Sequence, residues 1–245
     1  MKITVLGYNG GYPNNEIGTT GYLVQSQNYN LLLDAGSATL IELQKHLDPM
    51  LLDAVLITHY HNDHIADLGV IQYEWQLNKK IHLERLPIYG HKLDEANFNK
   101  LTWDNATIGK EYKPDEVLDL GPFEIRFLKT QHPVPAFAVG IKEKSSAKVL
   151  TFTADTRYFD GLSEFAADSD LLITDTNFMD DFDGVKWHLN TKETAKVFDE
   201  SQAKELLISH LAPKINKLDM LSEVKKFSKN PDKIIVPSKG KQIIL

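Results

Sequence analysis

The stretch DAVLITHYHNDHIADL, residues 53–68, decides the fold and raises the question of function. Its first six residues form a short apolar run that predicts a buried β-strand. Four side chains of metal-binding type then follow within six positions: His59, His61, Asp63 and His64. The apolar spacing from Ile65 to Asn78 predicts a helix after them. Polar groups gathered for structural reasons alone would lack partners, so this strand–turn–helix pattern indicates a metal site.

A polar residue directly after a predicted strand recurs three more times along the chain. FEIRFLKT is followed by His132, KVLTFTA by Asp155, and ELLIS by His210. Loops at strand ends of a rigid sheet can converge on one site. We therefore expect these three residues to join the four in the turn.

Together the seven residues are enough to hold two metal ions. His59, His61 and His132 would bind one ion, and Asp63, His64 and His210 the other. The carboxylate of Asp155 would bind both. Because the chain has no cysteine, the protein ligands must be nitrogen and oxygen atoms. We expect two Zn²⁺ ions, although Mn²⁺ or Fe²⁺ would also suit these ligand types.

The remaining pattern alternates between strands and helices. Strands are predicted at residues 2–7, 21–26, 30–36, 53–58, 86–90, 123–130, 136–142, 148–155, 170–175, 205–210 and 233–238. Helices are predicted at residues 37–47 with Ser37 as N-cap, 65–78, 191–203 and 215–228. Two β-rich halves interleaved with helices predict an α/β sandwich with helices outside two sheets. The chain has neither a linker-like tract nor a repeat, so we expect one domain over residues 1–245.

Composition and charge exclude several classes of protein. No apolar run approaches the roughly 20 residues of a membrane span, and the first residues do not resemble a signal peptide, so a cytoplasmic location is expected. The net charge of −7 argues against a nucleic-acid-binding protein, which is expected to have a basic surface. Residues 186–245 nevertheless carry 12 basic and 7 acidic side chains. They form either a lysine-rich helical surface or a basic rim that attracts an anionic substrate.

The motif H-x-H-x-D-H, followed in order by the later ligands, resembles the metallo-β-lactamase superfamily, and more closely its ribonuclease Z and phosphodiesterase branch. The similarity extends over nearly the whole chain, in VLGYNGGYP, LLLDAGSAT, LPIYG, FTADTR, HLNTKETA and LLISHLAP. The resemblance implies a four-layer αββα sandwich, a metal-dependent hydrolase and a homodimer.

Two departures from ribonuclease Z bear on the substrate. Ribonuclease Z has a long tRNA-gripping arm between the residues that correspond to His132 and Asp155. Here only 22 residues lie between them, and they are expected to form two strands. In addition, DTNF places Asp175 where the family more often has glutamate. We therefore do not expect whole tRNA to be a substrate.

Phosphodiester hydrolysis at such a site also needs an acid. Two ions about 3.5–4 Å apart generate hydroxide at neutral pH and hold a phosphate oxygen. His188 is the candidate that protonates the leaving alkoxide or contacts the phosphate, with a surface histidine beside a helix start as the alternative. Asp175 is a candidate to orient His188, and Asp63 counts as catalytic as well as a ligand.

Other polar residues carry weaker expectations. Asp67 is a candidate partner for a ligand imidazole or, equally, an ordinary aspartate at a helix N-terminus. His46, His82 and His91 match no ligand position, and we expect them at the surface or at helix ends.

The sequence thus favours a dinuclear zinc phosphodiesterase acting on small anionic phosphodiesters, such as cyclic nucleotides or short nucleotide diesters. One alternative is a tRNA 3′-processing endonuclease of the ribonuclease Z type. A second is a hydrolase of lactones, thioesters or sulfate esters, because the metal site alone does not choose the substrate. A third is a non-catalytic binding module, which the complete ligand set disfavours.

Overall fold

The computed structural model describes residues 1–78 and 84–245, which form two compact units. Unit 1 consists of Met1–Lys113 and Ser238–Ile244, and unit 2 of Pro114–Pro237 with Leu245. Each unit contains one β-sheet and its own helices. A single domain over residues 1–245 stays a prediction, and the prediction for His82 falls outside the described residues.

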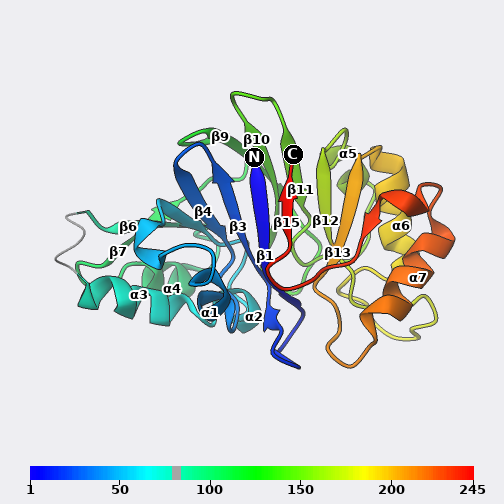
Figure 1. The fold of residues 1–245 in the computed structure, drawn as a ribbon, viewed down its shortest axis with the longest axis horizontal. Helices are drawn as coiled ribbons and strands as arrows, with labels where there is room; N and C mark the ends of the chain where they lie inside the picture. The colour runs from blue at the N-terminus through cyan, green and yellow to red at the C-terminus, as the bar shows by residue number, and fades with distance from the viewer. Residues whose placement is uncertain (79–83) are drawn as a thin grey trace. The chain divides into compact units, whose positions relative to one another are not determined.

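Unit 1 is built on one mixed, eight-stranded sheet. Its strands are β1 (Lys2–Asn9), β2 (Gly18–Thr19), β3 (Gly21–Ser26), β4 (Tyr29–Leu33), β5 (Ala54–Leu56), β6 (Leu86–Gly90), β7 (Thr107–Glu111) and β15 (Gln242–Ile244). They lie in the order β15-β1-β3-β4-β5-β6-β7, with β2 paired to β1. β15 runs antiparallel to β1, so the last strand of the chain lies beside the first (Figure 1). From β4 to β7 the neighbouring strands are parallel.

The helices of unit 1 cover the apolar face of this sheet. They are α1 (Thr39–Leu43), η1 (Pro49–Leu51), α2 (Asn62–Ile65), α3 (Leu68–Leu77), α4 (Glu95–Phe98) and η2 (Asn99–Leu101). Leu43, Ile71 and Phe98 from three of these helices pack with Leu32 and Val55 of the sheet in one buried cluster. Full burial of a side chain of this size contributes about 1.5–3 kcal/mol, so the cluster fixes where β4 and β5 end.

Two helix predictions in unit 1 are wrong in detail. The N-cap of α1 is Ala38, in a left-handed conformation and without a side-chain cap, rather than Ser37. The predicted helix over 65–78 is divided into α2 and α3, because the backbone there bonds across to the loop after β4. Ala35 donates to the His64 carbonyl at 2.8 Å and accepts from the Asp67 N–H at 2.9 Å.

Unit 2 is built on a seven-stranded sheet. Its strands are β8 (Leu118–Leu120), β9 (Phe123–Lys129), β10 (Phe137–Glu143), β11 (Val149–Phe152), β12 (Leu171–Asp175), β13 (Glu205–Ser209) and β14 (Ile234–Ile235). Their order follows the sequence from β8 to β14. β8 to β11 are antiparallel neighbours, whereas β11 to β14 run parallel. Within the parallel part, Asp175 pairs with Ser209, and this register brings the ends of β12 and β13 level.

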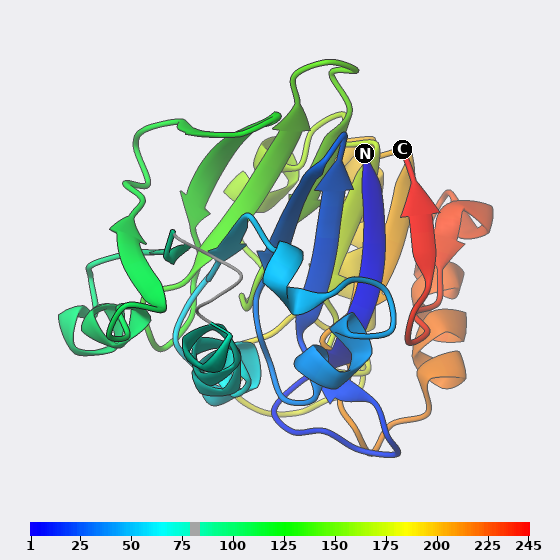
Figure 2. The same cartoon turned by 60° about the vertical axis from the view of Figure 1, so that its left-hand side comes forward.

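The helices of unit 2 are α5 (Gly161–Phe165), α6 (Thr191–Ser201), α7 (Lys217–Phe227) and η3 (Pro231–Lys233). α6 and α7 lie side by side beyond β13 (Figures 1 and 2). A capping box begins α6: the Asn190 side chain accepts from the Glu193 N–H, and the Glu193 carboxylate accepts from the Asn190 N–H. The cap fixes the point at which the loop after β12 enters the helix, directly after His188 and Leu189. Within the described residues, no helix has the length and apolar character needed to cross a membrane.

Candidate metal centre

The turn after β5 gathers three imidazoles in unit 1. The His59 ring centroid lies 4.9 Å from that of His61 and 4.1 Å from that of His64. α2 begins at the residue after His61, so its first turn carries both Asp63 and His64. His59 and His64 are fully buried. The turn thus brings the three rings close together, and their role as metal ligands stays a prediction.

A buried carboxylate that the sequence analysis missed, Asp34, holds this turn in place. Its Oδ2 lies 2.7 Å from His64 Nδ1, and its Oδ1 accepts from the Thr58 N–H at 2.8 Å. The Thr58 hydroxyl donates to Asp34 at 2.8 Å and lies 3.1 Å from His59 Nδ1. Full burial raises the pKa of Asp34, while the His64 and Thr58 contacts oppose that rise. Asp34 therefore fixes two of the three rings, one directly and one through Thr58.

Asp63 is positioned mainly by backbone. Its Oδ2 accepts from the Gly11 N–H at 2.7 Å and lies 3.8 Å from His64 Nε2. A Cβ on Gly36 would lie 2.1 Å from the Asp63 carbonyl oxygen, so only glycine allows this close approach. Gly36 thus lets the chain approach Asp63 closely, and Gly11, in left-handed backbone with a φ of 78°, directs its N–H at the carboxylate.

In unit 2 the Asp155 carboxylate faces two imidazoles with its two oxygens. Oδ2 lies 3.7 Å from His132 Nε2, and Oδ1 lies 3.3 Å from His210 Nε2. These side chains are almost completely buried. Ala154 and His210 both have left-handed backbone, with φ of 49° and 52°. Such strain persists where surrounding structure enforces it, and it is common at functional sites.

The spacing of these donor atoms fits a bound ion. Two atoms that each lie about 2.1 Å from one metal ion are about 3–4 Å apart. The separations from Asp155 to His132 and His210, and from Asp63 to His64, all fall in this range. Imidazole nitrogens with carboxylate oxygens are also the donor set that zinc and similar ions prefer. Each unit therefore supplies a cluster of His and Asp suited to metal.

Asp175, at the end of β12, contacts two histidines. Its Oδ2 lies 2.7 Å from His188 Nδ1 and accepts from the Thr156 N–H, while its Oδ1 lies 3.2 Å from His210 Nδ1. Donor atoms of Asp155, Asp175, His188 and His210 all lie within 4.8 Å of one another. Burial lowers the pKa of His188, but the Asp175 carboxylate outweighs this effect and the net shift is upward. His188 is therefore part of the cluster, and its contact with Asp175 is present as expected.

Asp67 has the second of its two expected roles, that of an aspartate at a helix N-terminus. It is the N-cap residue of α3, and its Oδ2 accepts from the Leu40 N–H at 2.8 Å in the first turn of α1. His91 is buried rather than at the surface, beside Tyr60, whose hydroxyl donates to the His91 carbonyl at 2.7 Å. His46 lies just beyond the end of α1, 3.1 Å from Glu42.

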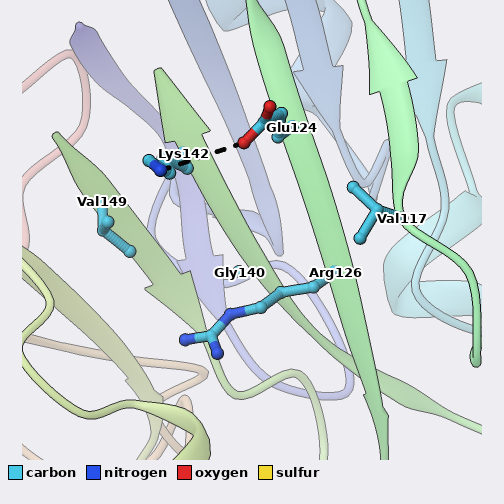
Figure 3. A pocket seen from close by; sticks show the side chains of 6 residues that line it. All are labelled: Val117, Glu124, Arg126, Gly140, Lys142 and Val149. Carbon is cyan, nitrogen blue, oxygen red and sulfur yellow. Dashed lines mark ion pairs between the residues drawn. The ribbon is translucent and has the colours of Figure 1, made fainter. Parts of the chain in front are cut away.

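Unit 2 also has a pocket on the strands β9 to β11 (Figure 3). None of the candidate metal ligands lines this pocket. Its lining residues are Val117, Glu124, Arg126, Gly140, Lys142 and Val149. Lys142 lies 3.9 Å from Glu124, and Arg126 passes over Gly140 to donate to the Phe165 carbonyl at 2.7 Å. Because both cations are already paired and no candidate ligand lines it, this pocket is not the chemical site.

Comparison with known proteins identifies relatives along the whole chain. The model of the metallo-beta-lactamase superfamily matches residues 15–239. The "probable metallo-hydrolase YhfI" of Bacillus subtilis (strain 168) is 46% identical over 216 residues, which cover 86% of this chain and 87% of that protein. The crystal structure of YhfI, described as a metallo-beta-lactamase fold protein, has a TM-score of 0.94 at 39% identity and covers 99% of this chain and 98% of YhfI.

More distant structures share the fold. The short form of human tRNase Z has a TM-score of 0.76 at 18% identity, covering 100% of this chain and 99% of that one. A diphosphatase from the PhnP family has the same TM-score at 15% identity, covering 100% and 97%. At these identities the likeness shows the fold alone. The predicted αββα sandwich is thereby confirmed as the fold class.

Proposed function

The chain belongs to the metallo-β-lactamase superfamily, and we propose that it is a dinuclear metal-dependent phosphodiesterase acting on small phosphodiesters. Family membership and the YhfI relative support a metal-dependent hydrolase, and the two His/Asp clusters are suited to metal. What we propose beyond this is that the site binds two ions, that they are Zn²⁺, and that the substrate is a phosphodiester. Cyclic nucleotides and short nucleotide diesters are the substrates that we favour.

The proposed ligand set combines the clusters of both units. One Zn²⁺ is held by His59, His61 and His132, the other by Asp63, His64 and His210, and Asp155 is shared. The observation that carries this proposal is the geometry of Asp155 within unit 2, where each carboxylate oxygen faces a different imidazole. A carboxylate placed in this way could give one oxygen to each of two ions, and bidentate binding of a single ion is the alternative that metal analysis tests.

Bound metal ions at such a site supply a nucleophilic hydroxide at neutral pH and polarise a phosphate oxygen. The chain's own residues then handle the leaving group. Asp175 holds His188 through Nδ1, which leaves Nε2 to donate a proton to the departing alkoxide. The same contact fixes the ring plane, so His188 needs no reorganisation during the reaction.

The favoured substrate is small because the segment that would correspond to the tRNA-binding arm of ribonuclease Z is short in this chain. Between His132 and Asp155 it contains only β10, β11 and short connections, as expected from the sequence. Human tRNase Z shares the fold, but at 18% identity its substrate cannot be assigned to this chain. A tRNA 3′-processing activity, hydrolysis of lactones, thioesters or sulfate esters, and a non-catalytic binding role are the alternatives.

The test is a substrate screen of zinc- and manganese-loaded protein. We expect cleavage of bis-p-nitrophenyl phosphate well above that of lactones, thioesters and sulfate esters, and poor processing of precursor tRNA. Metal analysis should give about two ions per chain. A preference for a lactone or thioester would replace the phosphodiesterase proposal, and a loaded protein without any activity would favour the binding module. A cytoplasmic location and a homodimer stay predictions, the latter testable by light scattering.

A further inference from the structure

We propose that the loop between β12 and α6, residues 176–190, recognises the nucleobase of the substrate through the exposed rings of Phe182 and Trp187. This inference rests on the proposed function. It names the nucleobase as the part of the substrate by which the protein distinguishes one phosphodiester from another. The rings belong to the same unit as Asp155 and His188, and their contacts connect them to His188 and to His132.

One ring stack begins beside His188. The Phe178 ring centroid lies 5.9 Å from that of His188. Phe178 stacks on Phe182, with centroids 4.0 Å apart and planes 16° from parallel. Phe182 nevertheless remains 41% exposed. The stack therefore extends from the proposed acid to an open aromatic face.

Trp187 is fixed by contacts with His132 and Arg157. It precedes His188 in the chain, and its carbonyl oxygen lies 3.3 Å from Nδ1 of His132, a proposed ligand. Its ring lies under the Arg157 guanidinium, 5.6 Å from centroid to Cζ, and is 39% exposed. Arg157 is itself anchored, because its Nε donates to Gln131 Oε1 at 2.8 Å. Trp187 is thus positioned relative to the chemistry although much of its ring faces outward.

The charge of the loop selects a small nucleotide over a polyanion. Asp180 and Asp181 directly precede Phe182 and Asp183 directly follows it, so a nucleic acid with many phosphates would be repelled. A diester with one phosphate, held by the metal site, presents an uncharged planar base to the loop. Aromatic faces bind any base by stacking, so the loop favours nucleosides without choosing among the bases.

The test compares two esters with the same leaving group. Thymidine 5′-(p-nitrophenyl phosphate) carries a base, and ethyl p-nitrophenyl phosphate does not; both release p-nitrophenolate. The wild type should prefer the thymidine ester in kcat/KM. In Phe182→Ala and Trp187→Ala this preference should fall by about 5- to 100-fold, the range for loss of base stacking. Val185→Ala, which changes a 76% exposed residue of the same loop, is the matched control and should retain the preference.

A binding measurement gives a readout that is independent of turnover. Calorimetry on the metal-loaded protein should show tighter binding of thymidine 5′-monophosphate than of deoxyribose 5-phosphate. The difference should shrink in Phe182→Ala and Trp187→Ala. Ring-current shifts of the thymine protons, seen by NMR in the wild type, should be lost in the same variants.

The outcomes separate this inference from the proposed function. If both esters are cleaved equally well and the two phosphates bind equally, the loop does not recognise the base, whereas the phosphodiesterase proposal stands. If neither ester is cleaved but the nucleotide still binds better, the phosphodiesterase proposal fails and the loop assignment holds. If Phe182→Ala and Trp187→Ala keep every preference but dissociate a dimer, the rings are a contact between copies and the inference is wrong.

Discussion

Each unit of the molecule holds its candidate ligands with one buried aspartate at the end of an apolar strand. In unit 1, Asp34 follows β4 and contacts His64; in unit 2, Asp175 ends β12 and contacts both His188 and His210. The two sets of ligands are assembled differently, however. Unit 1 supplies its four from a single turn, whereas unit 2 collects its three from the segments after β9, β11 and β13.

The two clusters therefore depend on different parts of the fold. In unit 1, one strand end and the first turn of α2 place every ligand, so the geometry is largely local. In unit 2 the ligands converge only if the strand pairings from β9 to β13 are in register. Unit 2 therefore carries Asp155, the proposed shared ligand, on the more cooperative part of the fold, after a strand that is paired on both sides.

The largest effect should come from Asp155, which the proposal assigns to both ions. Asp155→Ala should reduce bound metal from about two ions to less than one and lower turnover by more than the 10- to 100-fold typical of losing an outer hydrogen-bond partner. Metal analysis after dialysis, together with kcat on bis-p-nitrophenyl phosphate, measures this. Glu164→Ala, at an exposed position of α5, is the control. If Asp155→Ala keeps two ions, Asp155 is not a shared ligand.

His188 tests whether the second cluster contains a catalytic acid beside its ligands. His188→Ala should leave two metals bound and lower turnover about 100- to 10,000-fold on a diester with a poor leaving group. The loss should be smaller when p-nitrophenolate leaves, because that group departs without a proton. Loss of a metal ion in this variant would make His188 a ligand. Unchanged turnover on the poor leaving group would make it a surface histidine.

The two supporting aspartates allow a direct comparison of the units. Under the proposed ligand partition, His64 and His210 bind the same ion, so Asp34→Asn and Asp175→Asn should weaken the same one of two ions by about 10- to 100-fold. Asp175→Asn should also reduce turnover on poor leaving groups, since it releases His188. Competitive metal titration resolves the two ions, with the exposed Asp119→Asn as control. Weakening of different ions by the two variants would show that the partition is wrong.

The smallest effect concerns Asp170, immediately before β12, at the opposite end of the strand from Asp175. Burial opposes ionisation of Asp170, but contacts at 2.8 Å to Lys204 and 2.9 Å to Lys148 prevail and lower its pKa to about 2. Because its folded pKa lies below the unfolded value of 3.8, the stabilisation is full above about pH 4 and is lost as pH falls toward 2. Asp170→Asn should lower the free energy of unfolding by about 1 kcal/mol at pH 7. Urea titrations at several pH values measure this, and the difference should vanish near pH 2.

The sequence predicts the local parts of the fold better than the paired edges. β1, β3, β5 and β6 follow from their apolar composition, and α6 and α7 from their helical spacing. β15 is missed because Gln242–Ile244 is too short to indicate a strand. It forms only through its antiparallel pairing with β1, which lies at the other end of the chain. The break between α2 and α3 is also missed, because it depends on Ala35, about 30 residues earlier in the chain.

For the candidate site, the sequence identifies side chains that could bind metal but not those that hold them. Within each unit the structure brings the candidate residues close together, whereas the complete seven-residue set and its division between two ions stay predictions. Asp34 is missed because LLLDAG predicts only a strand and a turn, and its partner His64 is distant in sequence. A usable signal was present: LLLD and LLITD are both apolar strands that end in aspartate. Asp175 is predicted because DTNF resembles a segment of the family and because it ends a strand from which it could orient His188.

The register that pairs Asp175 with Ser209 has a consequence for how this chain can vary in length. Side chains alternate between the faces of a strand, so one inserted or deleted residue within β12 or β13 would turn every side chain beyond it to the opposite face. Asp175 or His210 would then point away from Asp155, although the apolar composition of the strand would hardly change. The turn at residues 144–148, between β10 and β11, has no such constraint. Relatives with different substrates are therefore expected to differ by insertions in such turns and to keep the lengths of β12 and β13.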